Sequence, residues 1–392
     1  MESQMLTFLT YFLLPLLVIL TAIYIAMIII KIKGDKGQNL SEPSPPFTII
    51  ARRKEVRCLA EQIQTGQSGA IIGVFIREGT LILKYLEERK EQLFGNQSDK
   101  FIFSFLDISA LSETITQTQF WAYALEPLQA KLASDADSPL FRAYELCQEK
   151  DFNNHYLDKL IAQIKQEGFR LVLMLDQFEV LLERPQLKNE EFLGGLRVLA
   201  SSRHPSSLCI MIASNEPVWQ FNEDTKSFNF GSPYLNFLEA GAITLGAISD
   251  KEIDELLDES GYSFTDDDKY FLKAVSGNHP YLLQVVTVIL IQAYRDQEEN
   301  PIESTRIIFF DKAEEMLTNI FKFWSPKLCE SFISVAQELD ISSFKREIKE
   351  LNKQGFIRKF NEGWQVRSSV FAEFVADKTV QELCQRKNNL EK

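Results

Sequence analysis

The sequence is poor in the residues that most often hold metal ions or build covalent cross-links. Its 392 residues include three histidines, far apart, and five cysteines, none of them in a C-x-x-C pair. Zinc sites and disulfide frameworks need such residues at short, regular spacings. We therefore expect no zinc site and no disulfide framework, which favours a reducing compartment.

Positive charge is also in short supply. The chain carries 42 basic and 55 acidic residues, a formal net charge of −13. A protein that binds nucleic acid through its backbone must neutralise phosphates with a basic surface. The acidic balance therefore argues against a general nucleic-acid binder.

The longest apolar run lies near the N-terminus. Residues 6–30, "LTFLTYFLLPLLVILTAIYIAMIII", contain no charge, and about 20 apolar residues span a bilayer as a helix. A cleaved signal peptide is the alternative, but it would carry positive charge before a shorter apolar core. Here Glu2 precedes the run and Lys31 and Lys33 follow it. We favour an uncleaved anchor over residues 1–33, with the rest of the chain in the cytoplasm.

After a Gly-, Ser- and Pro-containing linker over residues 34–46, short apolar runs alternate with helical patterns. Nearly continuous apolar strands between helices are typical of a parallel sheet covered on both faces. We therefore predict an α/β fold with a parallel five-stranded sheet. The predicted strands are 70–75, 101–108, 171–176, 208–214 and 242–246, and the helices around them are 53–65, 80–94, 118–133, 155–167 and 190–202.

The third apolar run ends in a carboxylate. Asp176 closes "LVLMLD", and ligands of open α/β sheets bind at the carboxyl ends of the strands. A carboxylate there can hold a Mg²⁺ ion that is bound to nucleotide phosphates. Glu179, three residues further on, could orient an attacking water. The alternative is that Asp176 only caps the turn after its strand.

The first apolar run leads into a segment with the spacing of a phosphate-binding loop. Such a loop reads G-x-x-x-x-G-K-[ST], and Gly73 to Thr80 read G-V-F-I-R-E-G-T. Glu78 stands at the second glycine and Gly79 at the lysine. A register shifted by one residue puts Thr80 at the lysine position and still supplies no cation. Replacing attraction by repulsion changes a contact worth up to about 4 kcal/mol near a surface, so we expect ATP to bind poorly.

One cation lies inside this segment. We expect Arg77 to point to solvent or to pair with Glu78, although it could partly replace the missing lysine. Restoring the loop by Glu78→Gly with Gly79→Lys should then create nucleotide binding, because Gly73 and Thr80 are already present.

In their order along the chain, several stretches resemble the STAND and AAA-like branch of P-loop NTPases, in particular its prokaryotic members. The resemblance covers nearly everything after residue 47. It rests on "FTIIARRKEV" at the opening motif, "GVFIREGT" at Walker A, "LVLMLDQFEVL" at Walker B, "LCIMIASNEP" at the sensor strand, "VSGNHPYLLQ" at the helical lid and "FKREIKELNKQGFIRKFNEGWQVRSSVFAEFV" at a winged helix.

The resemblance implies a domain organisation and a site. An NTPase-like α/β domain would cover 47–246, a helical lid 247–300, and a winged-helix domain with its tail 301–392. Mg-ATP or Mg-ADP would be the cofactor only if the altered site still binds nucleotide. The implied nucleotide-binding residues are Arg52, Gly73, Arg77, Gly79, Thr80, His279 and Pro280; the metal ligands are Thr80 and Asp176; Glu179 is catalytic only in an active enzyme and Asn215 is sensor-like.

Two of these assignments have local alternatives. His279 and Pro280 fit equally well as packing at a helix start, where proline is favoured. Residues 344–366 combine a basic helix with a hairpin, a pattern that can read DNA. Packing of this unit against the α/β domain and binding of anionic lipid are the alternatives, and we favour packing.

Together these features predict a membrane-anchored pseudo-NTPase that serves as an interaction, assembly or signalling module without efficient ATP hydrolysis. A nucleotide-binding ATPase with a divergent loop is the first alternative, and a membrane-tethered DNA-binding regulator is the second. We expect protein partners that the sequence does not name, leave oligomerisation open, and place the soluble domains on the cytoplasmic side of a prokaryotic inner membrane.

Overall fold

The computed structural model describes residues 47–384, apart from 134, 136, 202–206 and 226–233. The predicted anchor and linker, residues 1–46, lie outside the described residues. No helix within the described part combines the length and apolar character needed to cross a bilayer. The same described residues contain no cluster of three or more His, Cys, Asp or Glu side chains that could hold a metal ion.

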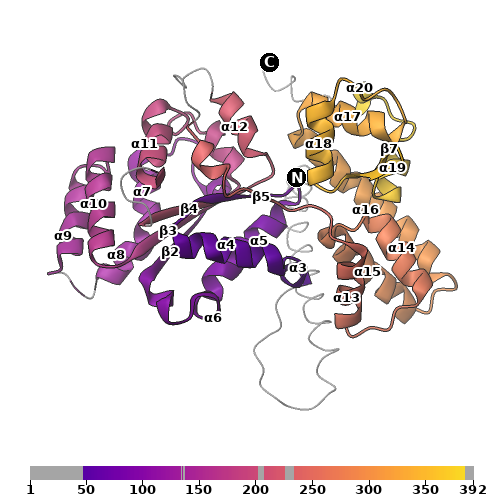
Figure 1. Cartoon of the computed structure of the whole chain (residues 1–392), viewed down its shortest axis with the longest axis horizontal. Coiled ribbons are helices and arrows are strands. Elements are labelled where there is room, and N and C mark those ends of the chain that lie inside the picture. Colours follow the sequence, from indigo (N-terminus) through magenta and orange to yellow (C-terminus); the bar gives the residue numbers. More distant parts are fainter. Residues whose placement is uncertain (1–46, 134, 136, 202–206, 226–233, 385–392) are drawn as a thin grey trace, which may run out of the picture.

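A parallel five-stranded sheet forms the centre of the N-terminal half of the fold (Figure 1). Its strand order is β2-β3-β4-β1-β5, so β4 lies between β1 and β3. Every pairing within this sheet is parallel, which confirms the predicted α/β sheet. The strands are β1 (Gly69–Ile72), β2 (Phe101–Asp107), β3 (Arg170–Asp176), β4 (Leu208–Ser214) and β5 (Ile243–Thr244).

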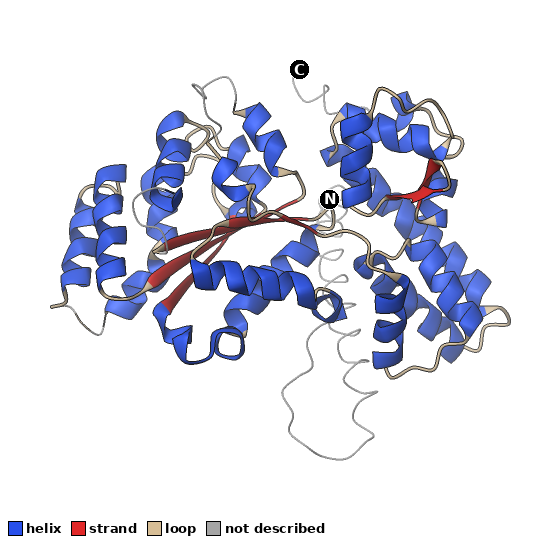
Figure 2. Ribbon diagram, viewed as in Figure 1, coloured by secondary structure: helices blue, strands red, loops and turns tan. Residues whose placement is uncertain are grey.

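Helices cover both faces of the sheet (Figure 2). Successive strand residues point to opposite faces, so Ala70 and Ile72 join one apolar cluster and Ile71 joins the other. The first face carries α7 (Gln117–Ala124), α8 (Glu126–Leu132), α9 (Pro139–Glu149), α10 (Asn154–Gln166), α11 (Glu190–Ser201) and α12 (Val218–Asp224), and the second carries α4 (Arg53–Thr65), α5 (Ile76–Glu88) and α6 (Lys90–Phe94). The short 3₁₀ turns are η2 (Gly95–Lys100), η3 (Ile108–Ala110), η4 (Phe178–Glu183) and η6 (Asn236–Leu238).

The helix boundaries follow local sequence signals. Thr116 and Gln119 form a capping box at the start of α7. Helix α4 ends at Gly66, whose φ of 76° suits a left-handed C-cap. The predicted helix over 80–94 is wrong at its start, because α5 already begins at Ile76.

The C-terminal half is mostly helical and shares one apolar cluster from Ile248 to Val375. Val74 and Phe75, which connect β1 to α5, belong to the same cluster, so the two halves pack together there. The hairpin between β6 and β7 turns at Asn361 and Glu362, and Asn361 has a φ of 51°. The elements are α13 (Asp250–Glu259), α14 (Asp266–Ser276), α15 (Pro280–Arg295), α16 (Pro301–Phe323), α17 (Pro326–Ala336), α18 (Lys345–Lys353), β6 (Ile357–Phe360), β7 (Gly363–Val366), α19 (Ser369–Val375) and α20 (Val380–Leu383).

A disulfide joins Cys329 of α17 to Cys384 at the end of α20. The sequence predicted no disulfide framework, and it did not indicate this single bond. The two cysteines are 55 residues apart in sequence, so no short spacing announces the bond, and only the packing of α20 against α17 brings them together. The remaining cysteines, Cys58, Cys147 and Cys209, are free.

The bond predicts the outcome of a cysteine count on unfolded protein. Alkylation without a reductant should modify three cysteines, and alkylation after reduction should modify all five. Mass spectrometry of the alkylated chain measures both numbers. Five labelled cysteines before reduction would show that Cys329 and Cys384 remain thiols.

Candidate functional site

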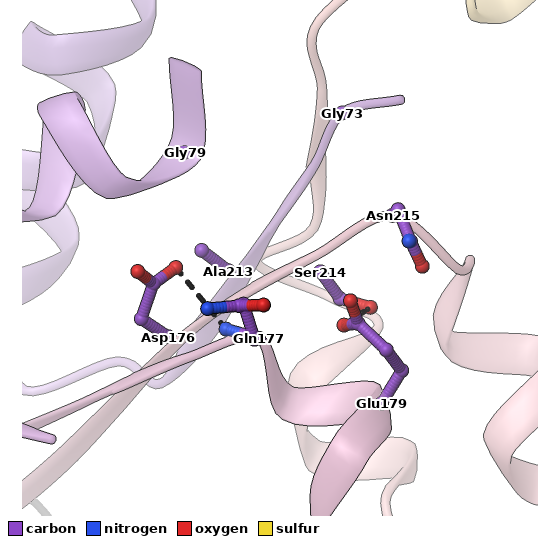
Figure 3. A pocket seen from close by; sticks show the side chains of 8 residues that line it. All are labelled: Gly73, Gly79, Asp176, Gln177, Glu179, Ala213, Ser214 and Asn215. Atoms are coloured by element: carbon purple, nitrogen blue, oxygen red, sulfur yellow. Dashed lines mark hydrogen bonds between the residues drawn. The ribbon is translucent and has the colours of Figure 1, made fainter. Parts of the chain in front are cut away.

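The carboxyl ends of three neighbouring strands meet at one edge of the sheet. Gly73 follows β1, Asp176 ends β3, and Ser214 ends β4, so a parallel sheet brings them to the place where α/β proteins bind ligands. A cleft lies there, with about 190 Å³ of empty space that includes its opening to solvent. None of its eight lining residues is basic; they are Gly73, Gly79, Asp176, Gln177, Glu179, Ala213, Ser214 and Asn215 (Figure 3).

The two predicted metal ligands lie next to each other. The Thr80 hydroxyl donates a 2.7 Å hydrogen bond to Oδ2 of Asp176, and the backbone N–H of Gln177 donates to Oδ1 at 3.1 Å. Burial raises the pKa of Asp176, and the bond from Thr80 opposes that shift. A hydroxyl and a carboxylate in contact form an oxygen-donor pair that suits Mg²⁺.

Glu179 lies across the cleft, on η4 (Figure 3). It accepts a 2.7 Å hydrogen bond from the Ser214 hydroxyl, and burial raises its pKa to about 7. Asn215 lines the same side, is 6% exposed, and its amide nitrogen and oxygen have no hydrogen-bond partner among the described residues. The structure thus brings the predicted catalytic and sensor-like residues together with Asp176.

The segment expected to form the phosphate loop is mostly helical. Only Gly73 to Phe75 separate β1 from α5, so Glu78 and Gly79 lie in the first turn of the helix. A Cβ atom on Gly79 would lie 2.9 Å from Cβ of Ala213 on β4, closer than real Cβ atoms approach one another. A side chain at position 79 would therefore force α5 or β4 to shift, which counts against the prediction that Glu78→Gly with Gly79→Lys creates nucleotide binding.

Glu78 is fully buried in the contact between the two halves. Its Oε1 lies 3.5 Å from Nη2 of Arg52, which is itself 1% exposed. Arg52 also pairs with Glu55 at 3.4 Å. Burial raises the pKa of Glu78, and the Arg52 charge opposes the shift. Arg77 is exposed, so Glu78 has its partner in Arg52 instead.

His279 completes this buried group from the C-terminal half. Its Nε2 lies 3.8 Å from Oε2 of Glu78, and its ring meets the Phe75 ring edge-on at 4.4 Å between centroids. Burial and the nearby Arg52 charge hold the pKa of His279 well below its usual value. The contact to Glu78 therefore involves a neutral ring, and His279 and Pro280 occupy the start of α15.

These residues do not fit a nucleoside triphosphate. A phosphate-binding loop exposes backbone N–H groups to the anion, but here a helical turn replaces most of that loop. The Arg52 guanidinium pairs with the Glu78 carboxylate, and none of the residues that line the cleft is positively charged. The oxygen donors Thr80 and Asp176 fit a metal ion, while none of the described residues that line the cleft supplies a cation for the phosphates.

Helix α18, of the C-terminal half, packs against the N-terminal half that contains the sheet (the sheet half), beside the edge that carries the cleft. The Arg346 guanidinium lies 3.6 Å from the centre of the Trp219 ring on α12. The turn after α18 is also close to the chain that leaves β5, because a Cβ atom on Gly355 would lie 2.1 Å from the backbone nitrogen of Ala247. The Arg346–Trp219 contact could not be predicted from the sequence, because no motif links these two residues.

The arrangement is that of an AAA-like P-loop ATPase. Residues 144–377, more than half of the chain, match the AAA-like domain family, and the chain belongs to it. A Walker-type ATPase of Pyrococcus abyssi is similar over 86% of this chain and 99% of that one, with 14% identity and a TM-score of 0.53. The ORC2 protein of Aeropyrum pernix in its ADPNP–ADP complexes is similar over 84% of this chain and 94% of that one, with 12% identity and a TM-score of 0.50.

At these identities the likeness concerns the fold alone. A STAND protein with a tetratricopeptide-repeat sensor from Pyrococcus horikoshii also matches, with 16% identity over 84% of this chain and 43% of that one. Its TM-score of 0.35 carries no argument about this chain. None of the curated proteins compared with the chain matches it.

The raised pKa of Glu179 predicts a pH-dependent stability difference. Because the folded state keeps a proton that the unfolded chain loses, Glu179 destabilises the fold increasingly as the pH rises from 4.5 to about 7. The variant Glu179→Gln should gain about 3 kcal/mol of unfolding free energy relative to the wild type across this window. Urea unfolding at several pH values measures the gain. The matched control is the exposed Glu183 of the same turn, and a Glu179→Gln curve parallel to that of Glu183→Gln would contradict the assignment.

Proposed function

We propose that the protein is a membrane-anchored pseudo-NTPase that works as an interaction, assembly or signalling module without efficient ATP hydrolysis. The observation that carries the proposal is the buried Glu78–Arg52 pair at the β1–α5 connection. It puts an acidic side chain of the protein where a member of this fold would receive nucleotide phosphates, and that side chain already engages the nearby arginine.

Charge and space both support this function. A phosphate group entering the site would meet the Glu78 carboxylate and would have to draw Arg52 away from it. Breaking a buried ion pair costs roughly 3–5 kcal/mol, and no basic residue lines the cleft to compensate. The first turn of α5 would also have to unwind. In the structure this turn packs closely on Ala213, because Gly79 has no side chain.

A nucleotide-binding ATPase is the second candidate. The hydrogen bond between Thr80 and Asp176, together with Glu179 and the unpartnered amide of Asn215, preserves the metal-binding and water-orienting side of such a site. This candidate requires Glu78 to leave its buried position. Arg52 would then become available to phosphates.

We also propose that α17, α18 and the β6–β7 hairpin form a winged helix that packs on the protein itself. The stacking of Arg346 on Trp219 supports this, because it turns part of the basic helix toward α12. Three lysines of α18, Lys345, Lys349 and Lys353, remain exposed. Any DNA affinity of this unit should therefore come from phosphate contacts and fall steeply with salt.

The cellular location belongs to the same proposal. The lysines that follow residues 6–30 support an anchor with the folded domains in the cytoplasm. The disulfide between Cys329 and Cys384 supports an oxidising compartment instead. Alkylation of the cysteines in intact cells before lysis distinguishes the two compartments. Cys329 and Cys384 should be labelled as thiols in the cytoplasm and protected as a disulfide in an oxidising compartment.

Nucleotide-dependent unfolding tests the proposed function. A ligand at 100 times its Kd stabilises a protein by about 2.7 kcal/mol, a shift that thermal unfolding detects. Because the proposed function excludes nucleotide binding, millimolar Mg-ATP or Mg-ADP should leave the unfolding temperature of the full-length protein unchanged. The variant Glu78→Ala should lose roughly 3–5 kcal/mol, because it leaves Arg52 buried without its main partner. The double variant Arg52→Met with Glu78→Leu should recover most of that loss, since apolar groups can replace such a pair.

The matched control is Arg77→Ala, which changes an exposed neighbour on the same helix turn and should shift stability by less than about 0.5 kcal/mol. An upward shift of the wild-type midpoint with Mg-ATP that Asp176→Ala abolishes would show that the site binds nucleotide, and the pseudo-NTPase proposal would fall.

A further inference from the structure

The first described residues of the chain lie between the two halves of the fold. Helix α3 (Phe47–Ala51) contacts α5 on the sheet side and α13 and α15 on the other (Figure 1). The segment Phe47–Lys54 follows directly on the linker over residues 34–46 and the uncharged apolar run over residues 6–30. A displacement of that preceding stretch would act first on this segment.

The segment attaches firmly to the sheet half. Ile49 is 3% exposed and belongs to the apolar cluster beneath the sheet, with Leu83 of α5. Arg52 reaches Glu78 on the first turn of α5. Both contacts are buried, so this side of the segment is part of the core.

The same residues hold the C-terminal half. The Thr48 hydroxyl donates a 3.1 Å hydrogen bond to Oε1 of Gln284 on α15. Phe47, Ile50 and Ala51 pack against the apolar cluster of that half. Helix α3 therefore contacts both halves at once.

Two ion pairs extend this bridge along α4. Arg53 lies 3.1 Å from Glu259 at the end of α13, and Lys54 pairs with Glu252 near its start. All four side chains are at least one-third exposed, so each pair is worth little alone. Together they fix both ends of α13 to the same helix.

We propose that Phe47–Lys54 is a clamp that holds α13 and α15 against the sheet half, and that moving this segment is the step that opens the protein. The clamp gives the N-terminal stretch control over the Glu78 site, because the residue that pairs with Glu78 is Arg52 of the clamp itself. It rests on the proposed function in one respect, namely that no nucleotide joins the two halves. The Arg346–Trp219 contact between α18 and α12 involves no residue of the clamp and would remain when the clamp moves.

Hydrogen–deuterium exchange of the full-length protein tests the clamp. The variant Arg53→Glu with Lys54→Glu changes only exposed side chains and leaves the capping box of Ser249 and Glu252 on α13 intact, so it should fold. Replacing two attractive pairs by repulsive ones should speed amide exchange in α13 and in the first turns of α15 about tenfold. Exchange in α9 and α10, at the distant end of the sheet half (Figure 1), should not change.

Two further variants make the result specific. Adding Glu259→Arg should restore part of the lost protection, because it rebuilds one pair with reversed sign. Lys251→Glu is the matched control for one of the two reversals, since it makes the same Lys-to-Glu change as at position 54 but within α13, where it breaks the Lys251–Glu255 pair of that helix. It should leave exchange in α15 unchanged.

The clamp is contradicted if the charge-reversed protein exchanges α13 and α15 at the wild-type rate, if all helices of both halves speed up equally, or if Glu259→Arg restores nothing. Repeating the exchange with Mg-ATP separates the two proposals. Slower exchange around Glu78 in wild type and variant alike would overturn the pseudo-NTPase function and leave the clamp standing.

Discussion

A buried ion pair between Glu78 and Arg52 organises this protein. The two side chains are 0% and 1% exposed, and charges so deeply buried are tolerated only when they are paired. Arg52 comes from the N-terminal segment, Glu78 from the helix after the first strand, and the neighbouring His279 from the C-terminal half. The pair and the neighbouring His279 therefore join three parts of the chain, and separating them would leave the Glu78 carboxylate buried without its partner.

The rest of the site follows from the helical turn that carries Glu78. Gly79 lets α5 approach β4 closely, at Ala213, and both residues line the cleft. Phe75 fills the space on the other side against His279 and Tyr281. The acidic edge of the cleft, with Asp176 and Glu179, is built by β3, η4 and β4. It therefore does not depend on the connection between β1 and α5. In the proposed function, the protein therefore keeps the acidic side of an NTPase site and has lost the side that binds phosphates.

Sequence could predict the elements whose signal is local. Apolar runs located all five strands of the sheet, and the amphipathic pattern of residues 53–65 gave α4 with its observed bounds. The start of α5 was not predicted, because residues 73–80 have the spacing of a glycine loop. The helical turn forms there because Phe75 and Glu78 are buried against partners that are distant in sequence. For the same reason the partner of Glu78, the stacking of Arg346 on Trp219 and the bond between Cys329 and Cys384 were not predictable: each joins residues whose proximity exists only in the fold.

Crystals of the full-length protein grown with millimolar Mg-ATP would test the central claim most directly. The account predicts that the Glu78 carboxylate remains buried beside Arg52, that α5 still begins at Ile76, and that no phosphate density lies between Gly73 and Thr80. Phosphates bound in that segment, with Glu78 turned outward and Arg52 redirected to the nucleotide, would contradict it.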